Sequence, residues 1–139
     1  MSVLLPSSPK QREVWSKARP EPVVLELPGW SQSIIEPDAS QPNQRWINFE
    51  KDGGRIEWMR YWDTPLNPGY PMARESARDV MVAGRKTELV TTSMFDGAPM
   101  RVWVFWLTGE GHGVKYGVRV VVRREEDVET ALAAVRVAW

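Results

Sequence analysis

Two consecutive segments near the C-terminal end constrain this chain most strongly. From Met100 to Leu107 the sequence reads Met-Arg-Val-Trp-Val-Phe-Trp-Leu, with apolar side chains on both faces of an extended chain. From Val114 to Val122 apolar residues alternate with polar ones, and Lys115 and Arg119 lie on the face opposite the valines. Alternation with a period of two is typical of a half-buried strand, whereas an apolar run on both faces indicates a strand covered on each side. The pair predicts two adjacent strands that run in opposite directions, the first of them central in a sheet.

A second hairpin is predicted upstream of this pair. Residues 46–50 alternate, Asp52-Gly53-Gly54 supplies the positive φ angles of a tight turn, and residues 55–62 return as the next strand. Residues 23–27 are also β-prone and end at the turn dipeptide Pro28-Gly29.

The middle of the chain predicts a mixture of loops and further strands. Residues 31–45 and 64–71 carry several prolines and are expected to be loops, as is the glycine-rich stretch 108–113. Residues 72–79 are compatible with a short helix or with a strand. Further strands are expected at 80–82 and 86–95, with turns at 83–85 and 96–99.

The last segment changes to a helical period. Between Glu125 and Ala138, apolar residues recur at Val128, Leu132 and Val135 and continue to Trp139, which forms one helical stripe. Glu125 and its two acidic neighbours stand where a helix macrodipole favours negative charge. The prediction is a single α+β domain over residues 23–139. Six to seven mainly antiparallel strands are packed by a C-terminal helix, and residues 1–22 precede them as an arm or short helix.

Composition limits the classes of function. The net charge is zero, with 18 basic and 18 acidic side chains, which argues against nucleic-acid binding because phosphate contacts require a basic surface. The chain has no cysteine, so thiol catalysis and cysteine-ligated metals are excluded. No apolar stretch reaches the roughly 20 residues of a membrane span, and the first ten residues do not resemble a signal peptide. A cytoplasmic protein is expected, with an exported mature domain as the alternative.

Recognisable catalytic motifs are absent from the sequence. His112, the single histidine, lies in a glycine-rich stretch without a second histidine or cysteine for a metal site. No P-loop, nucleophile elbow or dinucleotide fingerprint occurs, and carboxylate pairs such as Glu57 with Asp63 are expected to be solvated. The sequence therefore predicts no catalytic residue, no metal and no cofactor.

The eight tryptophans are the unusual feature of the composition. Trp58, Arg60 and Trp62 fall on one face of a predicted strand, and such interleaving of aromatic and basic side chains can bind sugar rings or bases. Burial in the core is the competing interpretation, because each indole buries a large area. Trp103 and Trp106 are expected on opposite faces of their strand. We expect most tryptophans to be buried, with one or two partly exposed.

Parts of the chain resemble the Mog1/PsbP-like group of α/β/α sandwich proteins. The resemblance rests on Leu-Glu-Leu-Pro-Gly-Trp at 25–30, Val-Ala-Gly-Arg-Lys at 82–86, and the strand at 114–122 followed by a final amphipathic helix. The hairpin at 46–62 has no counterpart in that pattern. The group has no shared catalytic residue, so the resemblance implies a binding, assembly or lipoprotein module rather than an enzyme.

Two functions remain open at this point. The first is a non-catalytic module that binds another protein or a second copy of itself. The alternative is a domain that binds a small molecule or glycan, with or without enzymatic activity. Its candidate residues are Trp58, Arg60, Trp62 and His112.

Overall fold

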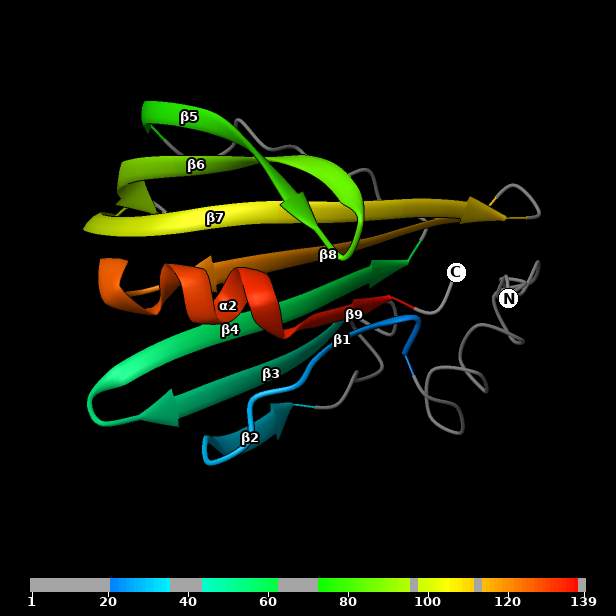
Figure 1. The fold of residues 1–139 in the computed structure, drawn as a ribbon, viewed down its shortest axis with the longest axis horizontal. Coiled ribbons are helices and arrows are strands. Elements are labelled where there is room, and N and C mark those ends of the chain that lie inside the picture. The colour runs from blue at the N-terminus through cyan, green and yellow to red at the C-terminus, as the bar shows by residue number, and fades with distance from the viewer. Residues whose placement is uncertain (1–20, 36–43, 63–72, 96–97, 112–113, 138–139) are drawn as a thin grey trace.

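A seven-stranded antiparallel sheet forms one layer of the molecule, and a short helix with a two-stranded ribbon forms the other (Figure 1). The computed structural model describes residues 21–35, 44–62, 73–95, 98–111 and 114–137. The expected fold class, an α+β domain built mainly of antiparallel strands, is confirmed. The predicted arm at 1–22 lies outside the described residues except for Glu21 and Pro22, as do the loop at 64–71 and Trp139.

The described strands are numbered in the order in which they occur along the chain. They are β1 (Val23–Leu25), β2 (Ser31–Ile35), β3 (Gln44–Lys51), β4 (Gly54–Trp62), β5 (Ala73–Val82), β6 (Arg85–Phe95), β7 (Ala98–Gly111), β8 (Val114–Val122) and β9 (Val135–Val137). The large sheet has the order β2-β3-β4-β8-β7-β6-β5, and β1 pairs with β9 in the small ribbon. Between β8 and β9 lie the 3₁₀ turn η1 (Glu125–Asp127) and the helix α2 (Val128–Ala134).

The two strands predicted at 100–107 and 114–122 are adjacent, as expected. β7 and β8 run antiparallel, with Trp103 opposite Val122 and Leu107 opposite Val118. Trp103, Phe105 and Leu107 lie on the face that α2 covers, which we call the helix-covered face. Val102, Val104 and Trp106 are buried on the opposite face together with Val90, Phe95 and Val121. The expectation of a strand buried on both faces is therefore confirmed.

Two tight turns follow the predicted chemistry. Lys51 and Gly54 pair across a two-residue turn in which Asp52 has φ 49° and Gly53 has φ 81°. Ala83 and Gly84 form an equivalent turn, with φ 49° and 78°. Positive φ at both central residues matches the right-handed twist of the flanking strands.

Several element predictions need correction. Residues 31–35, expected in a loop, form β2, because the backbone of this short polar segment pairs with β3 from Ser31 opposite Glu50 to Ile35 opposite Trp46. Residues 108–111, also expected in a loop, extend β7, where Thr108 lies opposite Gly117. The segment 73–79, left open between helix and strand, is part of β5.

The predicted C-terminal helix is shorter than its pattern. α2 ends at Ala134, and Val135–Val137 continues as β9, opposite β1. The β-branched Val135 and Val137 favour an extended backbone. Pairing with β1 provides hydrogen-bond partners for the backbone groups of this extended segment. The stripe nevertheless docks as expected: Val128 and Val135 are buried, and Leu132 packs against the core of the helix-covered face.

Candidate functional site

Trp58 and Arg60 share one face of β4, as the alternation predicts, and that face is the helix-covered one. The exposed fractions of the two side chains are 1% for Trp58 and 0% for Arg60. The Trp58 indole nitrogen donates a hydrogen bond of 3.1 Å to the main-chain carbonyl of Val23 in β1. Trp58 therefore fixes the terminal ribbon to the sheet and presents no ring face to solvent.

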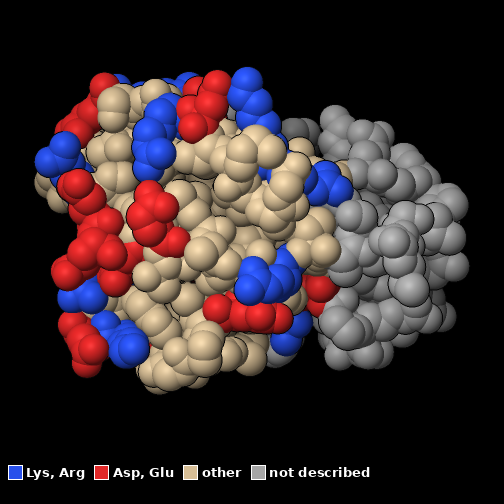
Figure 2. Space-filling view, in the orientation of Figure 1, with Lys and Arg blue, Asp and Glu red and all other residues tan. Residues whose placement is uncertain are grey.

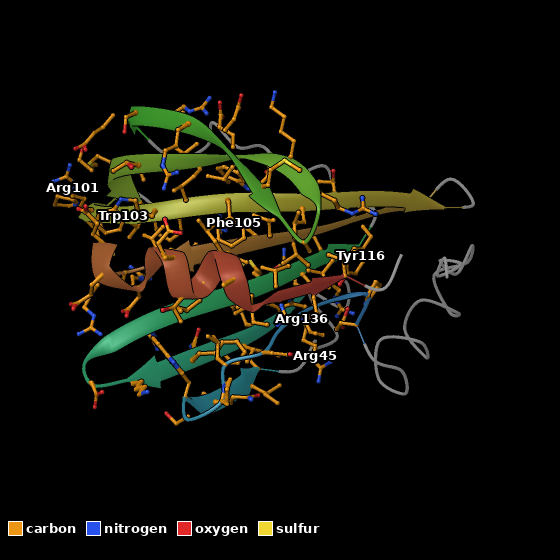
Figure 3. All side chains as sticks on the ribbon, in the orientation of Figure 1. Arg45, Arg101, Trp103, Phe105, Tyr116 and Arg136 are labelled. Atoms are coloured by element: carbon orange, nitrogen blue, oxygen red, sulfur yellow. The ribbon has the colours of Figure 1, made fainter. Side chains whose placement is uncertain are left out.

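Arg60 belongs to a buried polar cluster centred on Glu21. Its guanidinium donates to Glu21 Oε1 at 3.0 Å, and the Tyr116 hydroxyl donates to Glu21 Oε2 at 2.9 Å. Arg45, from β3, lies 3.6 Å from Glu21 Oε1. The labelled side chains of Tyr116 and Arg45 lie toward the same end of the sheet (Figure 3). Three strands thus converge on one carboxylate, which lies two residues before the start of β1.

The pKa values of two members of the cluster, Glu21 and Tyr116, are both raised. Burial raises the pKa of the Glu21 carboxyl above its ordinary value, and the charge of Arg60 offsets only part of this effect. Burial also raises the pKa of Tyr116 well above 10, and the negative charge of Glu21 adds to the shift. The arrangement connects Glu21 to strands β3, β4 and β8.

The four sequence candidates are therefore only partly brought together. Trp58 and Arg60 lie in the interior, so a stacking platform on β4 lacks two of its three members. Trp62 ends β4 opposite Tyr116, and its side chain is outside the described part, as is all of His112.

The described tryptophans are less buried than expected: of the five whose side chains are described, Trp58 and Trp106 are buried and the other three are partly exposed. Trp106 is buried on the opposite face, while Trp30 and Trp103 are partly buried against the helix-covered core. Trp46 is the most exposed of the described set, at 37%. Trp103 and Trp106 point to opposite faces of β7, which confirms that prediction.

Exposed apolar side chains lie along one edge of the sheet, on both of its faces. Strand β2 is the edge strand there, and all five of its residues are exposed. Ile34 and Ile35 each expose 50% of their surface. Ile35 pairs with Trp46 on one face of the sheet, and Ile34 pairs with Ile47 on the helix-covered face. We call Ile34, Ile35 and Trp46 the β2 edge patch. Half-exposed isoleucines on an edge strand are unusual, because unpaired backbone and apolar side chains together favour association.

Sequence reasoning missed both the Glu21 cluster and the β2 edge patch. Glu21 lies in a proline-bounded segment, and nothing local signals that its carboxylate is buried. The pair Ile34-Ile35 was a usable signal, since two isoleucines in an otherwise polar stretch favour a strand.

The described residues contain no group of three or more side chains suited to hold a metal ion. Among the helices in the described ranges, none has the length and apolar character needed to cross a membrane. Comparison with protein-family models, curated proteins and solved structures yields no match to the chain. The resemblance to the Mog1/PsbP-like group accordingly stays a prediction.

Proposed function

We propose that the protein is a non-catalytic assembly module that associates with a second copy of itself through the β2 edge. The observation that carries this proposal is the chemistry of β2: each residue of Ser-Gln-Ser-Ile-Ile is exposed, and the strand holds neither a charge nor a proline. Natural edge strands are normally protected by charged side chains, proline or bulges, because an unprotected edge pairs with other chains.

The other edge of the same sheet supplies an internal comparison. Strand β5 carries Arg74, Glu75, Arg78 and Asp79, and its register with β6 is interrupted near its beginning. Charged side chains gather along the upper edge in Figure 2, over β5, whereas the lower edge, over β2, is mainly uncharged. One edge is thus protected against pairing and the other is open to it.

The β2 sequence is also compatible with itself. In an antiparallel pair around a two-fold axis, every side chain of one β2 faces a serine, glutamine or isoleucine of the other. No like charges meet, and Ile35 and Trp46 add apolar area beside the new strand pair. Because β2 is only five residues long, the interface is small and the expected dimer is weak, with a Kd of about 10 µM or higher.

Sedimentation velocity over a range of protein concentrations tests the proposal. We expect a concentration-dependent dimer for the unmodified chain and a monomer at every concentration for the variants Ile34→Lys and Ile35→Lys. Met81→Lys is the matched control, because Met81 lies on the β5 edge and is 65% exposed. A chain that remains monomeric at several hundred micromolar would refute self-assembly, and equal effects of all three lysine variants would refute the assignment to β2.

A further inference from the structure

A cleft of about 520 Å³ lies between the sheet and the beginning of the helical segment, at the end of the sheet where β7 starts. Strands β5, β6 and β7 form one wall, and η1 and α2 form the other. Arg101 and Trp103, both in the first part of β7, lie at this end of the molecule beside the start of the helical segment (Figure 3). The volume is within the range of small-molecule sites.

The cleft offers an apolar and aromatic surface. Leu89 and Val128 are buried and contribute to its lining, and Trp103 contributes a partly buried indole. The guanidinium of Arg101 is 6.0 Å from the centre of the Trp103 ring. A planar ring next to a cationic donor can bind the apolar face of a ligand and a polar group at its edge at the same time.

The charges in the lining cancel. Arg78 and Arg101 are matched by Glu125 and Glu129, and Arg78 pairs with Glu129 at 3.5 Å across the cleft. Arg101 also pairs with Glu75 at 3.2 Å. A phosphate or dicarboxylate bound here would lie beside these carboxylates, so an anionic ligand is disfavoured.

The polar groups of the cleft suit hydroxyl groups. Guanidinium groups only donate hydrogen bonds, carboxylates only accept them, and the hydroxyls of Ser76 and Thr91, which also line the cleft, do both. A ligand hydroxyl donates and accepts as well, and it therefore matches neighbouring guanidinium and carboxylate groups. An uncharged ligand with an apolar face and several hydroxyls combines both requirements.

We propose that this cleft binds a neutral carbohydrate, with a sugar ring against Trp103 and its hydroxyls bonded to Arg101 and Glu129. The site is separate from the β2 edge patch, since β5 and β2 are opposite edges of the sheet. Carbohydrate binding goes beyond the proposed assembly and does not depend on it.

Saturation-transfer NMR of the full chain tests this proposal with a panel of neutral mono- and oligosaccharides, including hexoses, N-acetylhexosamines and pentoses. AMP and glucuronic acid serve as anionic comparators. We expect transfer to at least one neutral saccharide and none to the anions. Because Arg101 and Glu129 expose 64% and 83% of their side chains, Arg101→Ala and Glu129→Gln should fold normally, which circular dichroism checks.

Loss of a charged hydrogen-bond partner is expected to raise the Kd by about tenfold or more in each variant. Lys86→Ala is the matched control, because Lys86 is 70% exposed on β6 and does not line the cleft, and its Kd should be unchanged. The proposal is overturned if no neutral saccharide binds at about 10 mM. It is overturned equally if an anion binds better than every neutral sugar, or if Arg101→Ala and Glu129→Gln bind as the unmodified chain does.

Discussion

Replacement of Trp58 tests whether this tryptophan is part of the core or part of a binding surface. Trp58 is 1% exposed, and its indole N–H donates a hydrogen bond to the Val23 carbonyl. Trp58→Ala therefore creates a cavity in the core and removes the hydrogen-bond donor of the Val23 carbonyl. Truncation of a buried aromatic side chain costs about 3–5 kcal/mol. A domain of this size has about 5–15 kcal/mol of total stability, so the variant loses a large part of it.

The loss of unfolding free energy can be converted to a decrease in the melting temperature, Tm. Unfolding entropy of about 2.1 cal/mol/K per residue over 139 residues means that 1 kcal/mol shifts the Tm by about 3–4 °C. Trp58→Ala is therefore expected to lower the Tm by about 10–17 °C.

Urea unfolding followed by far-ultraviolet circular dichroism measures the loss without relying on tryptophan emission. Trp46→Ala is the matched control: Trp46 is 37% exposed on the neighbouring strand, and its loss should cost about 1 kcal/mol or less. Equal losses of stability in the two variants, or a Trp58→Ala protein as stable as the unmodified chain, would refute the assignment of Trp58 to the core.

Two further predictions concern the buried cluster and a turn. Because the pKa of Tyr116 is raised, the folded chain keeps this proton where the unfolded chain loses it, so stability is expected to fall as the pH rises from 10 toward the folded pKa. Absorbance at 295 nm should show at least one of the three tyrosines ionising only as the protein unfolds, and ionisation of all three near pH 10 in the folded state would contradict this. Ala83 has a φ of 49°, a conformation that asparagine tolerates better than alanine, so Ala83→Asn is expected to raise stability by about 0.5–1 kcal/mol. A lower Tm for Ala83→Asn would show that this turn is not strained.

The elements that could be predicted from the sequence are those whose signals are local. The β3–β4 turn has Asp52 and Gly53, whose backbone requirements are explicit, and β8 alternates so regularly that its bounds match the prediction. The stripe through Val128 and Leu132 likewise identified the helix that covers the sheet.

The elements that were missed depend on partners distant in the sequence. Ser31–Ile35 becomes a strand because β3 lies beside it, and Val135–Val137 leaves the helical pattern because β1 offers backbone groups to pair with. The burial of Arg60 depends on Glu21, which no periodic pattern connects to β4. The candidate binding residues on β3 and β4 were the least predictable part. Whether Trp46 or Trp58 is exposed depends on which face of the sheet the helix covers, and the sequence of these strands does not indicate that face.

The β1–β9 ribbon has a consequence for how the chain acquires its structure during synthesis. Val23 pairs with Val137, so β1 cannot complete its ribbon until all of the strands between them in the sequence have been synthesised. At about 5–20 residues per second, β1 stays without its partner for several seconds while the intervening strands leave the ribosome. The main sheet can form in that interval, but the Val23 carbonyl that receives the Trp58 indole is held in place only when β9 arrives. We therefore expect nascent chains that end before Val135 to remain sensitive to protease, and chains that extend through Val137 to become resistant.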